Sequence, residues 1–391
     1  MPGDAADSPD RMMKSFSELP RMTMLGELRA NGIRFGRALR EEHGLDLQLL
    51  FREGTDDVWG AQWAPPVDDS LPWVHRYRWT VANPVVALTT LVKLRKLVAS
   101  HPLVWGRSGG GLLGMLLGLP YVMQTVGSDV ADMQFHQWWL RRVILRALRR
   151  ARLIMASQIR HLPILRNLGL NHVFLPLPVW EVPAEEHVKP QHPEGFDLVF
   201  FTCTPFYWKG IRELPKGNDR FLRGFARFVK TGANVCLVAV EHGLNIVEAR
   251  QLIQELGISD RVFFLPKQTQ RELAGHYAAC DVVVDNFVCG EPGLATMDSM
   301  PHGVPAMAYV DPEAAQLAYQ DDLHPIVNVS TDQEIFDGLV RLASAEYRQE
   351  LGSQARAWWR RHHHPEVAAQ KLLVILNEVA TGYDPEQSAS L

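Results

Sequence analysis

Residues 281–309, DVVVDNFVCGEPGLATMDSMPHGVPAMAY, contain residue types and spacings that could bind a nucleotide. Three valines in a row at 282–284 predict a strand that is buried on both faces. Gly290 and Gly293 follow this strand, and glycine lets a backbone come close to a ligand. The chemistry that such a loop could support is the binding of a phosphate group with a sugar beside it.

A helix is predicted to begin directly after this loop. The first main-chain amides of a helix have no partner within it and can bind an anion. We expect the amides of Leu294, Ala295 and Thr296 to do so. Asp298 lies one turn into the helix, where its carboxylate could accept hydrogen bonds from ribose hydroxyls. For this stretch alone, an ordinary strand-to-helix turn of an α/β domain is the alternative.

Two Lys-Gly pairs in the second half, beginning at Lys209 and Lys216, could supply a cation for a diphosphate. Without a metal, the charge of a diphosphate must be offset by cations and helix amides. We prefer Lys216, because Asn-Asp at 218–219 suits the start of a helix, whereas Pro215 follows Lys209 before any helix can form. A solvated surface lysine is the alternative for each.

The 281–309 block resembles the donor-site motif of the retaining nucleotide-sugar glycosyltransferases of family 4. The resemblance rests on Glu291, Gly293, Asp-Ser-Met at 298–300 and Gly-Val-Pro at 303–305. It implies that Lys216 and Arg212 act at the leaving diphosphate and that Glu291 reaches the sugar. Asp298 replaces the family's usual Glu, and Gly290 occupies the position of its first acid.

The resemblance also implies site residues outside this block. Gly243, in a turn after a predicted strand, is expected near the donor, and Gly26 is expected near the donor phosphate. Asp129 ends the stretch TVGSD, which is similar to a first-domain turn of the family, although Val126 stands where His is common. A helix N-cap is the alternative role for Asp129.

An acceptor-side region is predicted in an irregular segment rich in tryptophan. His75 and Trp79 are its candidates, because aromatic faces stack on sugar rings. A loop held in place by its own tryptophans is the alternative. The glycines at 106 and 109–111 could line the same cleft or allow a helix to pack closely on the sheet, and we favour packing.

The order of predicted elements favours two parallel α/β domains. The chain has 391 residues, of which 47% are hydrophobic and 21% charged, so it can bury two cores. With the resemblance, this predicts a GT-B fold: two doubly wound Rossmann-like domains facing across a cleft. We expect a disordered tail at 1–20, an acceptor domain at 21–180, a linker at 181–195, a donor domain at 196–350, helices at 351–380 that cross back to the first domain, and a disordered tail at 381–391.

Several classes of partner are not expected. The net charge of −4 gives no global field that would point to nucleic acid. The four cysteines have no metal-ligand spacing, and we expect no metal and no cofactor apart from the donor nucleotide sugar. No signal peptide or membrane-spanning run is visible, so we expect a cytoplasmic protein. Residues 138–152 form a basic amphipathic stretch that could contact a membrane peripherally, with a solvated helix face as the alternative.

These expectations combine into one functional hypothesis with two rivals. The chain would transfer a sugar from a nucleoside diphosphate donor to a hydroxyl of a glycan, lipid-linked or small-molecule acceptor, with retention at the anomeric carbon. A non-catalytic nucleotide-binding or partner subunit of the same fold is the first rival. A sugar-nucleotide epimerase is the second, although we find no clustered acid and base for it.

Overall fold

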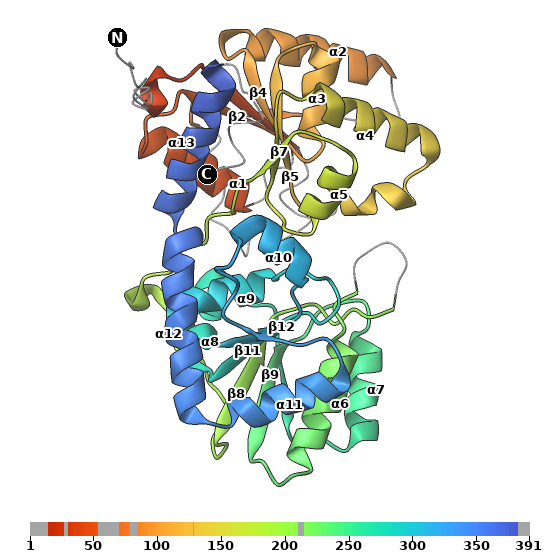
Figure 1. The fold of residues 1–391 in the computed structure, drawn as a ribbon, viewed down its shortest axis with the longest axis vertical. Helices are drawn as coiled ribbons and strands as arrows, with labels where there is room; N and C mark the ends of the chain where they lie inside the picture. Colours follow the sequence, from red (N-terminus) through yellow and green to blue (C-terminus); the bar gives the residue numbers. More distant parts are fainter. Residues whose placement is uncertain are drawn as a thin grey trace, which may run out of the picture.

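The computed structural model describes residues 15–26, 30–53, 70–78, 84–127, 129–209 and 215–381. Within these ranges the chain forms two α/β domains, drawn one above the other in Figure 1. Each domain is built on a parallel sheet. The predicted fold class is therefore confirmed.

The first domain contains, in its described part, a sheet of seven parallel strands in the order β3-β2-β1-β4-β5-β6-β7. Its strands are β1 (Met22–Gly26), β2 (Leu47–Arg52), β3 (Val74–Tyr77), β4 (Leu103–Arg107), β5 (Tyr121–Thr125), β6 (Ile154–Ala156) and β7 (His172–Phe174). Its helices are α1 (Ala30–Glu41), α2 (Pro84–Leu97), α3 (Gly110–Leu117), α4 (Trp138–Arg150) and α5 (His161–Asn167).

Alternation along the strands gives this sheet two buried faces. Met22 and Met24 of β1 pack with α1 in one cluster, whereas Leu25 packs with α2 to α5 in another. Both sets are almost fully buried, as expected for a parallel sheet that is covered on both faces.

The second domain contains, among the described residues, six parallel strands in the order β10-β9-β8-β11-β12-β13. They are β8 (Leu198–Thr202), β9 (Val235–Val240), β10 (Val262–Leu265), β11 (Val282–Val284), β12 (Ala306–Ala308) and β13 (Val327–Asn328). The helices are α6 (Asn218–Val229), α7 (Ile246–Leu256), α8 (Gln270–Ala279), α9 (Leu294–Ser299), α10 (Pro312–Tyr319) and α11 (Asp332–Leu342).

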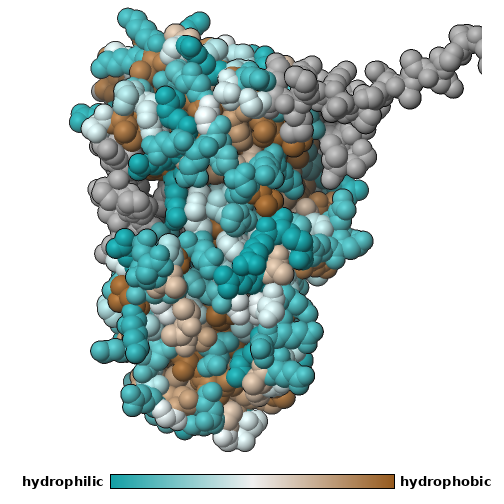
Figure 2. Space-filling view, turned by 90° about the vertical axis from the view of Figure 1, so that its left-hand side faces the viewer, coloured by the Kyte–Doolittle hydropathy of each residue, from teal (hydrophilic) through white to brown (hydrophobic). Residues whose placement is uncertain are grey.

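Two consecutive helices connect the domains at the end of the described chain. α12 (Ala345–His362) runs along the second domain and α13 (Pro365–Thr381) runs along the first (Figure 1). Leu372 and Leu376 of α13 are buried in the same cluster as Met22 of β1. The predicted return of the C-terminal helices to the first domain is thus confirmed. Figure 2 shows the side of the molecule that carries these helices, where hydrophilic side chains dominate.

The predicted N-terminal tail needs a correction over residues 15–20. Phe16–Glu18 form a 3₁₀ turn, and the side chains of Phe16 and Leu19 are each only 6% exposed, in the cluster that also holds α1. Their apolar side chains anchor this segment to the core. Residues 1–14 and 382–391, which the predicted tails also include, lie outside the described residues. No helix in the described ranges is long and apolar enough to cross a membrane.

The glycine cluster packs α3 directly onto the strand ends. A Cβ at Gly110 would lie 1.7 Å from the carbonyl O of Leu25, and one at Gly106 would lie 2.3 Å from the amide N of Gly111. Gly26 has a φ of 130° and approaches the carbonyl of Arg107 equally closely. This confirms the packing interpretation of the cluster and explains Gly26 without a ligand.

We predict that Gly110→Ala lowers the free energy of unfolding by at least about 1–3 kcal/mol, because the added methyl group overlaps backbone that cannot move aside cheaply. Gly109→Ala is the matched control, since a Cβ there meets nothing within 4 Å and its φ is −57°. Urea unfolding followed by circular dichroism measures both. Equal midpoints for the two variants would contradict the packing role of Gly110.

Candidate functional site

Loops that follow the carboxyl ends of strands in the two sheets meet between the domains. Arg160 follows β6 and Glu291 follows β11, and the main-chain N–H of Arg160 donates to Oε2 of Glu291 at 3.1 Å. In open parallel sheets, ligands bind outside the carboxyl ends of the strands. The interdomain face around this contact is therefore the candidate site.

Lys216 and Glu291 lie on this face. The segment that carries Lys216 is fixed by its main chain, because its N–H donates to the carbonyl of Tyr207 and its own carbonyl accepts from Phe287. Its Nζ lies 3.6 Å from Sγ of Cys289. Lys216 is half-buried and forms no ion pair with a carboxylate among the described residues, so its charge is available to a ligand.

Burial raises the pKa of Glu291 to about 8, although the positive charges of Arg160 and Lys216 act in the opposite direction. The carboxyl group is therefore largely protonated at neutral pH and can donate as well as accept a hydrogen bond. Two cations and one neutral acid on one face suit a substrate with a negative group next to hydroxyl groups.

Arg160 is a site residue that was not predicted. Its guanidinium donates to Oε1 of Gln158 and to the carbonyl of Gly127, while its main chain holds Glu291. Its place in the loop after the apolar run at 153–156 was the available signal. No motif of the second domain could have identified its partner, since the contact joins residues 131 positions apart.

The turn that contains Asp129 is stabilised by hydrogen bonds to residues of the first domain. Its Oδ2 accepts from the N–H of Val126 at 2.9 Å. The buried ring of His161 hydrogen-bonds to the turn and to the preceding strand. Its Nε2 lies 3.1 Å from the carbonyl O of Gly127, and its Nδ1 lies 3.1 Å from Oγ1 of Thr125. Burial lowers the pKa of His161 to about 3, so this imidazole is neutral. Asp129 and His161 thus position the Gly127 carbonyl that binds Arg160.

The N-terminus of α9 already holds a carboxylate of the chain itself. Asp285 is 2% exposed, and its Oδ2 accepts from the N–H of Thr296 at 3.1 Å and from the Thr296 hydroxyl at 2.8 Å. Its Oδ1 accepts from the hydroxyl of Thr204 at 2.7 Å. A Cβ at Gly293 would lie 2.3 Å from Oδ2 of Asp285.

This arrangement corrects the prediction for Thr296, because its amide is occupied by the carboxylate of Asp285. The absence of a side chain at Gly293 makes room for the same carboxylate, and contact of Gly293 with a ligand stays a prediction. The amides of Leu294 and Ala295 donate to no described residue. Leu294 itself is 61% exposed, so this end of α9 borders solvent.

Asp298 lies near charges from both domains. Burial, together with the negative charge of Asp285, raises its pKa to about 7, although the guanidinium of Arg34 in α1 acts in the opposite direction. Arg34 stacks over the ring of Trp180, with 4.6 Å from its central carbon to the ring centroid. Arg34 was not predicted, because its helix belongs to the first domain and carries no recognisable motif. The ribose contact of Asp298 stays a prediction.

The other predicted site residues make contacts within their own domains. Gly243 has a φ of 122°, and a Cβ there would lie 2.4 Å from the backbone of Phe206, so its close approach is internal. Gly290 has a φ of 67° and accepts from the N–H of Asp311 at 3.1 Å. His75 lies in the edge strand β3, where burial and nearby His101 lower its pKa.

The structure does not bring His75 together with Lys216 and Glu291, since His101 precedes β4, at the other end of the sheet from the interdomain face. Arg212 and Trp79 lie outside the described residues. Within the described part of the chain, no group of three or more His, Cys, Asp or Glu side chains is placed to hold a metal ion.

Comparison with known proteins establishes the fold. Sucrose-phosphate synthase from Thermosynechococcus elongatus superposes with a TM-score of 0.65 at 17% identity, covering 92% of this chain and 99% of that one. Anabaena HepE, solved with UDP-glucose, gives 0.65 at 15% identity, covering 92% and 100%. A glycosyltransferase from Rickettsia africae gives 0.62 at 11% identity, covering 92% and 98%. The chain therefore has the GT-B fold.

Sequence comparison reaches only part of the chain. D-inositol 3-phosphate glycosyltransferase from Mycolicibacterium smegmatis is 32% identical over 96 residues, which are 24% of this chain and 22% of that protein. The protein of the same name from Mycobacteroides abscessus is 33% identical over 96 residues, 24% and 21% of the two chains. The match thus spans less than a quarter of these relatives. No family model matches the chain.

The two raised pKa values predict how stability changes with pH. Both carboxyl groups keep their proton in the folded chain at pH values where the unfolded chain has lost it, so stability falls as pH rises from about 4 to about 8. We predict that Glu291→Gln and Asp298→Asn, without ligand, are each more stable than the parent at about pH 9, by on the order of 1–3 kcal/mol.

Near pH 5 the stability advantage of the variants should be much smaller. At that pH folding takes up fewer protons at Glu291 and Asp298, so the parent loses less stability than at pH 9. Thermal melts at the two pH values measure the effect, and Glu255→Gln on the exposed side of α7 is the control. If a variant were more stable than the parent by the same free energy at both pH values, burial would not have raised the pKa of that carboxyl group.

Proposed function

We propose that the chain is a glycosyltransferase that uses a nucleoside diphosphate sugar as donor and a hydroxyl group as acceptor. The convergence of Lys216, Arg160 and Glu291 at the carboxyl ends of two parallel sheets is the observation that carries this proposal. The fold supports it, since HepE of the same fold is solved with UDP-glucose. The partial match to two inositol-phosphate glycosyltransferases supports it as well.

Lys216 is assigned to the leaving diphosphate. When the bond between the anomeric carbon and the phosphate oxygen breaks, negative charge grows on that oxygen. A preorganised cation in a partly water-excluded site stabilises this charge more than it stabilises the bound donor. The sulfur of Cys289 is a weak acceptor, so Nζ of Lys216 gives up little when a phosphate replaces that contact.

Glu291 is assigned to the sugar. A carboxyl group with a pKa of about 8 adds little negative charge beside a diphosphate, yet it can donate to and accept from sugar hydroxyls. The N–H of Arg160 fixes one of its oxygens, so its orientation depends on the two domains being in contact. Sugar recognition would then require the closed arrangement of the domains.

We assign retention to the reaction, because a retaining transfer needs no dedicated base on the acceptor side. Val126 stands where a histidine is common in the family, and His161 is buried below the turn with its ring engaged by Gly127 and Thr125. The acceptor hydroxyl would then lose its proton to the departing phosphate oxygen. Its own oxygen bonds to the anomeric carbon on the face that the phosphate leaves, which keeps the configuration.

The nucleotide is assigned to the second domain, with the ribose near Asp298. Lys216, Arg160 and the predicted Arg212 would offset the diphosphate charge without a metal. A thermal-shift panel of UDP, GDP, ADP, CDP and dTDP identifies the base, because a ligand that binds only the folded state raises its stability. Failure of all five to shift the transition would favour the non-catalytic rival. Product analysis with the preferred donor separates transfer from epimerisation.

We predict that Lys216→Ala lowers donor turnover by roughly 10²–10³-fold while the fold stays intact, as expected for the loss of one charge-stabilising contact in the transition state. Lys209→Ala is the matched control, since Lys209 is exposed and lies in the neighbouring Lys-Gly pair. Initial rates with the preferred UDP-sugar or its equivalent measure the effect. If the Lys209 variant lost turnover while the Lys216 variant kept near-normal turnover, the contact with the leaving diphosphate would be assigned to Lys209 instead of Lys216.

We predict that Asp298→Asn weakens binding of the preferred nucleoside diphosphate by about one to two orders of magnitude. The loss follows because a charged hydrogen bond to ribose is worth roughly 1.5–3 kcal/mol. The 2′-deoxy nucleotide should bind the parent weakly and the variant no worse. Titration calorimetry measures both ligands on both proteins. Unchanged affinity for the ribonucleotide would remove Asp298 from the site.

A further inference from the structure

The part of the first domain from residue 70 to residue 180 is far more basic than the chain as a whole. Residues 70–180 contain fourteen lysines and arginines but only two acidic residues, Asp129 and Asp132, whereas the whole chain has a net charge of −4. From 133 to 180 there is no acidic residue at all. Such separation of charge within one molecule creates a strong local positive potential that the overall charge conceals.

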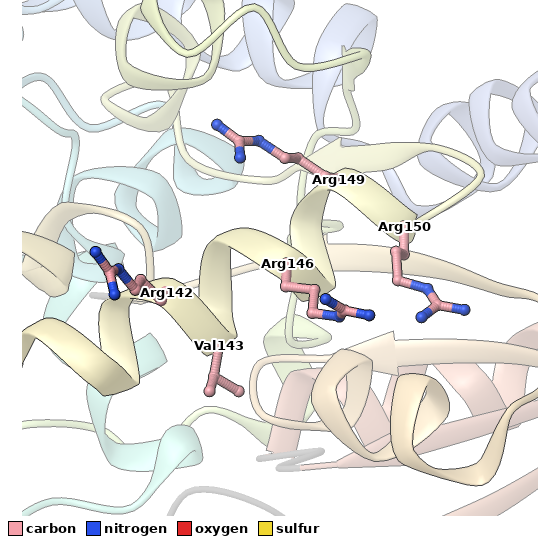
Figure 3. A pocket seen from close by; sticks show the side chains of 5 residues that line it. All are labelled: Arg142, Val143, Arg146, Arg149 and Arg150. Atoms are coloured by element: carbon pink, nitrogen blue, oxygen red, sulfur yellow. The ribbon is translucent and has the colours of Figure 1, made fainter.

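The solvent side of α4 concentrates this charge. Arg142, Val143, Arg146, Arg149 and Arg150 line an open groove along the helix, and their side chains fan out from it (Figure 3). In the part of the chain that the structure describes, none of these arginines forms an ion pair with a carboxylate. Ala147 and Leu148 face inward and anchor the helix to the domain.

Large apolar side chains are exposed beside these arginines. Trp138 is 69% exposed and Trp139 is 50% exposed, in the first turn of α4. α3 contacts both α2 and α4, and all three helices pack on the same face of the sheet. The exposed apolar residues of α2 and α3 are Val85 at 69%, Leu88 at 64%, Val92 at 52% and Leu116 at 49%. We call the solvent side of these three helices the α2–α4 surface.

We infer that the α2–α4 surface docks on an anionic lipid bilayer. Tryptophan prefers the boundary between headgroups and acyl chains, arginine binds lipid phosphates, and aliphatic side chains insert beside them. The guanidinium of Arg142 lies over the Trp138 ring, 5.0 Å from its centroid, so basic and aromatic groups act together. A nucleic acid would satisfy the arginines but would leave the exposed aliphatic residues of α2 without a partner.

The docking does not depend on the proposed transferase activity. It would place the first domain, including the turn at Gly127 that binds Arg160, on the membrane. A membrane contact would also explain why the exposed apolar residues are tolerated, since patches of this kind on soluble surfaces are usually interaction sites.

Co-sedimentation of the full chain with vesicles tests this inference. We expect binding to vesicles of phosphatidylcholine with phosphatidylglycerol, weak binding to phosphatidylcholine alone, and loss of binding at high salt. The double variant Arg146→Glu/Arg149→Glu should bind at least roughly twentyfold more weakly, because each basic residue near an anionic surface contributes about fivefold. Arg360→Glu, on the exposed side of α12, is the matched charge control.

The double variant Trp138→Ser/Trp139→Ser separates a membrane from a polyanion. It should lose vesicle binding and the blue shift of tryptophan fluorescence that accompanies it, while Leu244→Ser, at a 72% exposed site near α7, should retain both. All substituted residues are exposed, so thermal midpoints should be unchanged. No binding to anionic vesicles at low salt would overturn the inference. Equal binding of parent and tryptophan variant to duplex DNA and to vesicles would assign the surface to a polyanion instead.

Discussion

The carboxylate of Asp285 is the interaction on which the second half of the site depends. It lies almost completely buried and binds the hydroxyl of Thr204 after β8 and the amide and hydroxyl of Thr296 in α9. A buried charge is tolerated only when it is fully hydrogen-bonded, and a helix N-terminus adds a favourable dipole. These bonds fix α9 to two strands, so the position of Asp298 one turn later follows from them.

The contact between the domains depends on packing as much as on charge. One apolar cluster contains Leu162 and Phe174 of the first domain together with Ala314 and Tyr319 of α10 and Trp359 of α12. Phe174 and Tyr319 meet edge to face, with 5.1 Å between ring centroids. This cluster brings the loop after β6 to the loop after β11, and the hydrogen bond from Arg160 to Glu291 follows from that proximity. The geometry of the site thus depends on the packing of the two domains.

Sequence reasoning reached the fold because local signals repeat along the chain. Runs rich in β-branched residues such as 235–240 and 282–284 predict strands covered on both faces, and their alternation with helices leaves few topologies. It proposed Lys216 and Glu291 through their resemblance to a motif and their spacing to neighbouring elements, and their roles toward a ligand stay predictions. It failed for Arg160 and Arg34, because their roles come from contacts across the domain interface that no local pattern encodes.

The same limit explains the error at the start of α9. The amides there were expected to be free because a helix N-terminus usually lacks internal partners. Asp285, eleven residues before Thr296, supplies a hydrogen-bond acceptor for the Thr296 amide. The loop can bring this carboxylate so close because Gly293 has no side chain in its way. A carboxylate directly after a buried strand, followed by a glycine and a helix, is the pattern that could have indicated it.

The two buried acids link the stability of the fold to the ligand that the site is proposed to bind. Burial makes Glu291 and Asp298 bind protons more tightly than they would in water, so the ligand-free fold is weakened as pH rises toward neutrality. A donor with a diphosphate, ribose and sugar would supply hydrogen bonds to these groups and negative charge to Lys216 and Arg160. Its binding energy would therefore offset the free-energy cost of burying these two acids. A ligand that binds only the folded state stabilises it, and here Arg160 of the first domain joins Lys216 and Glu291 of the second only when the two domains are in contact.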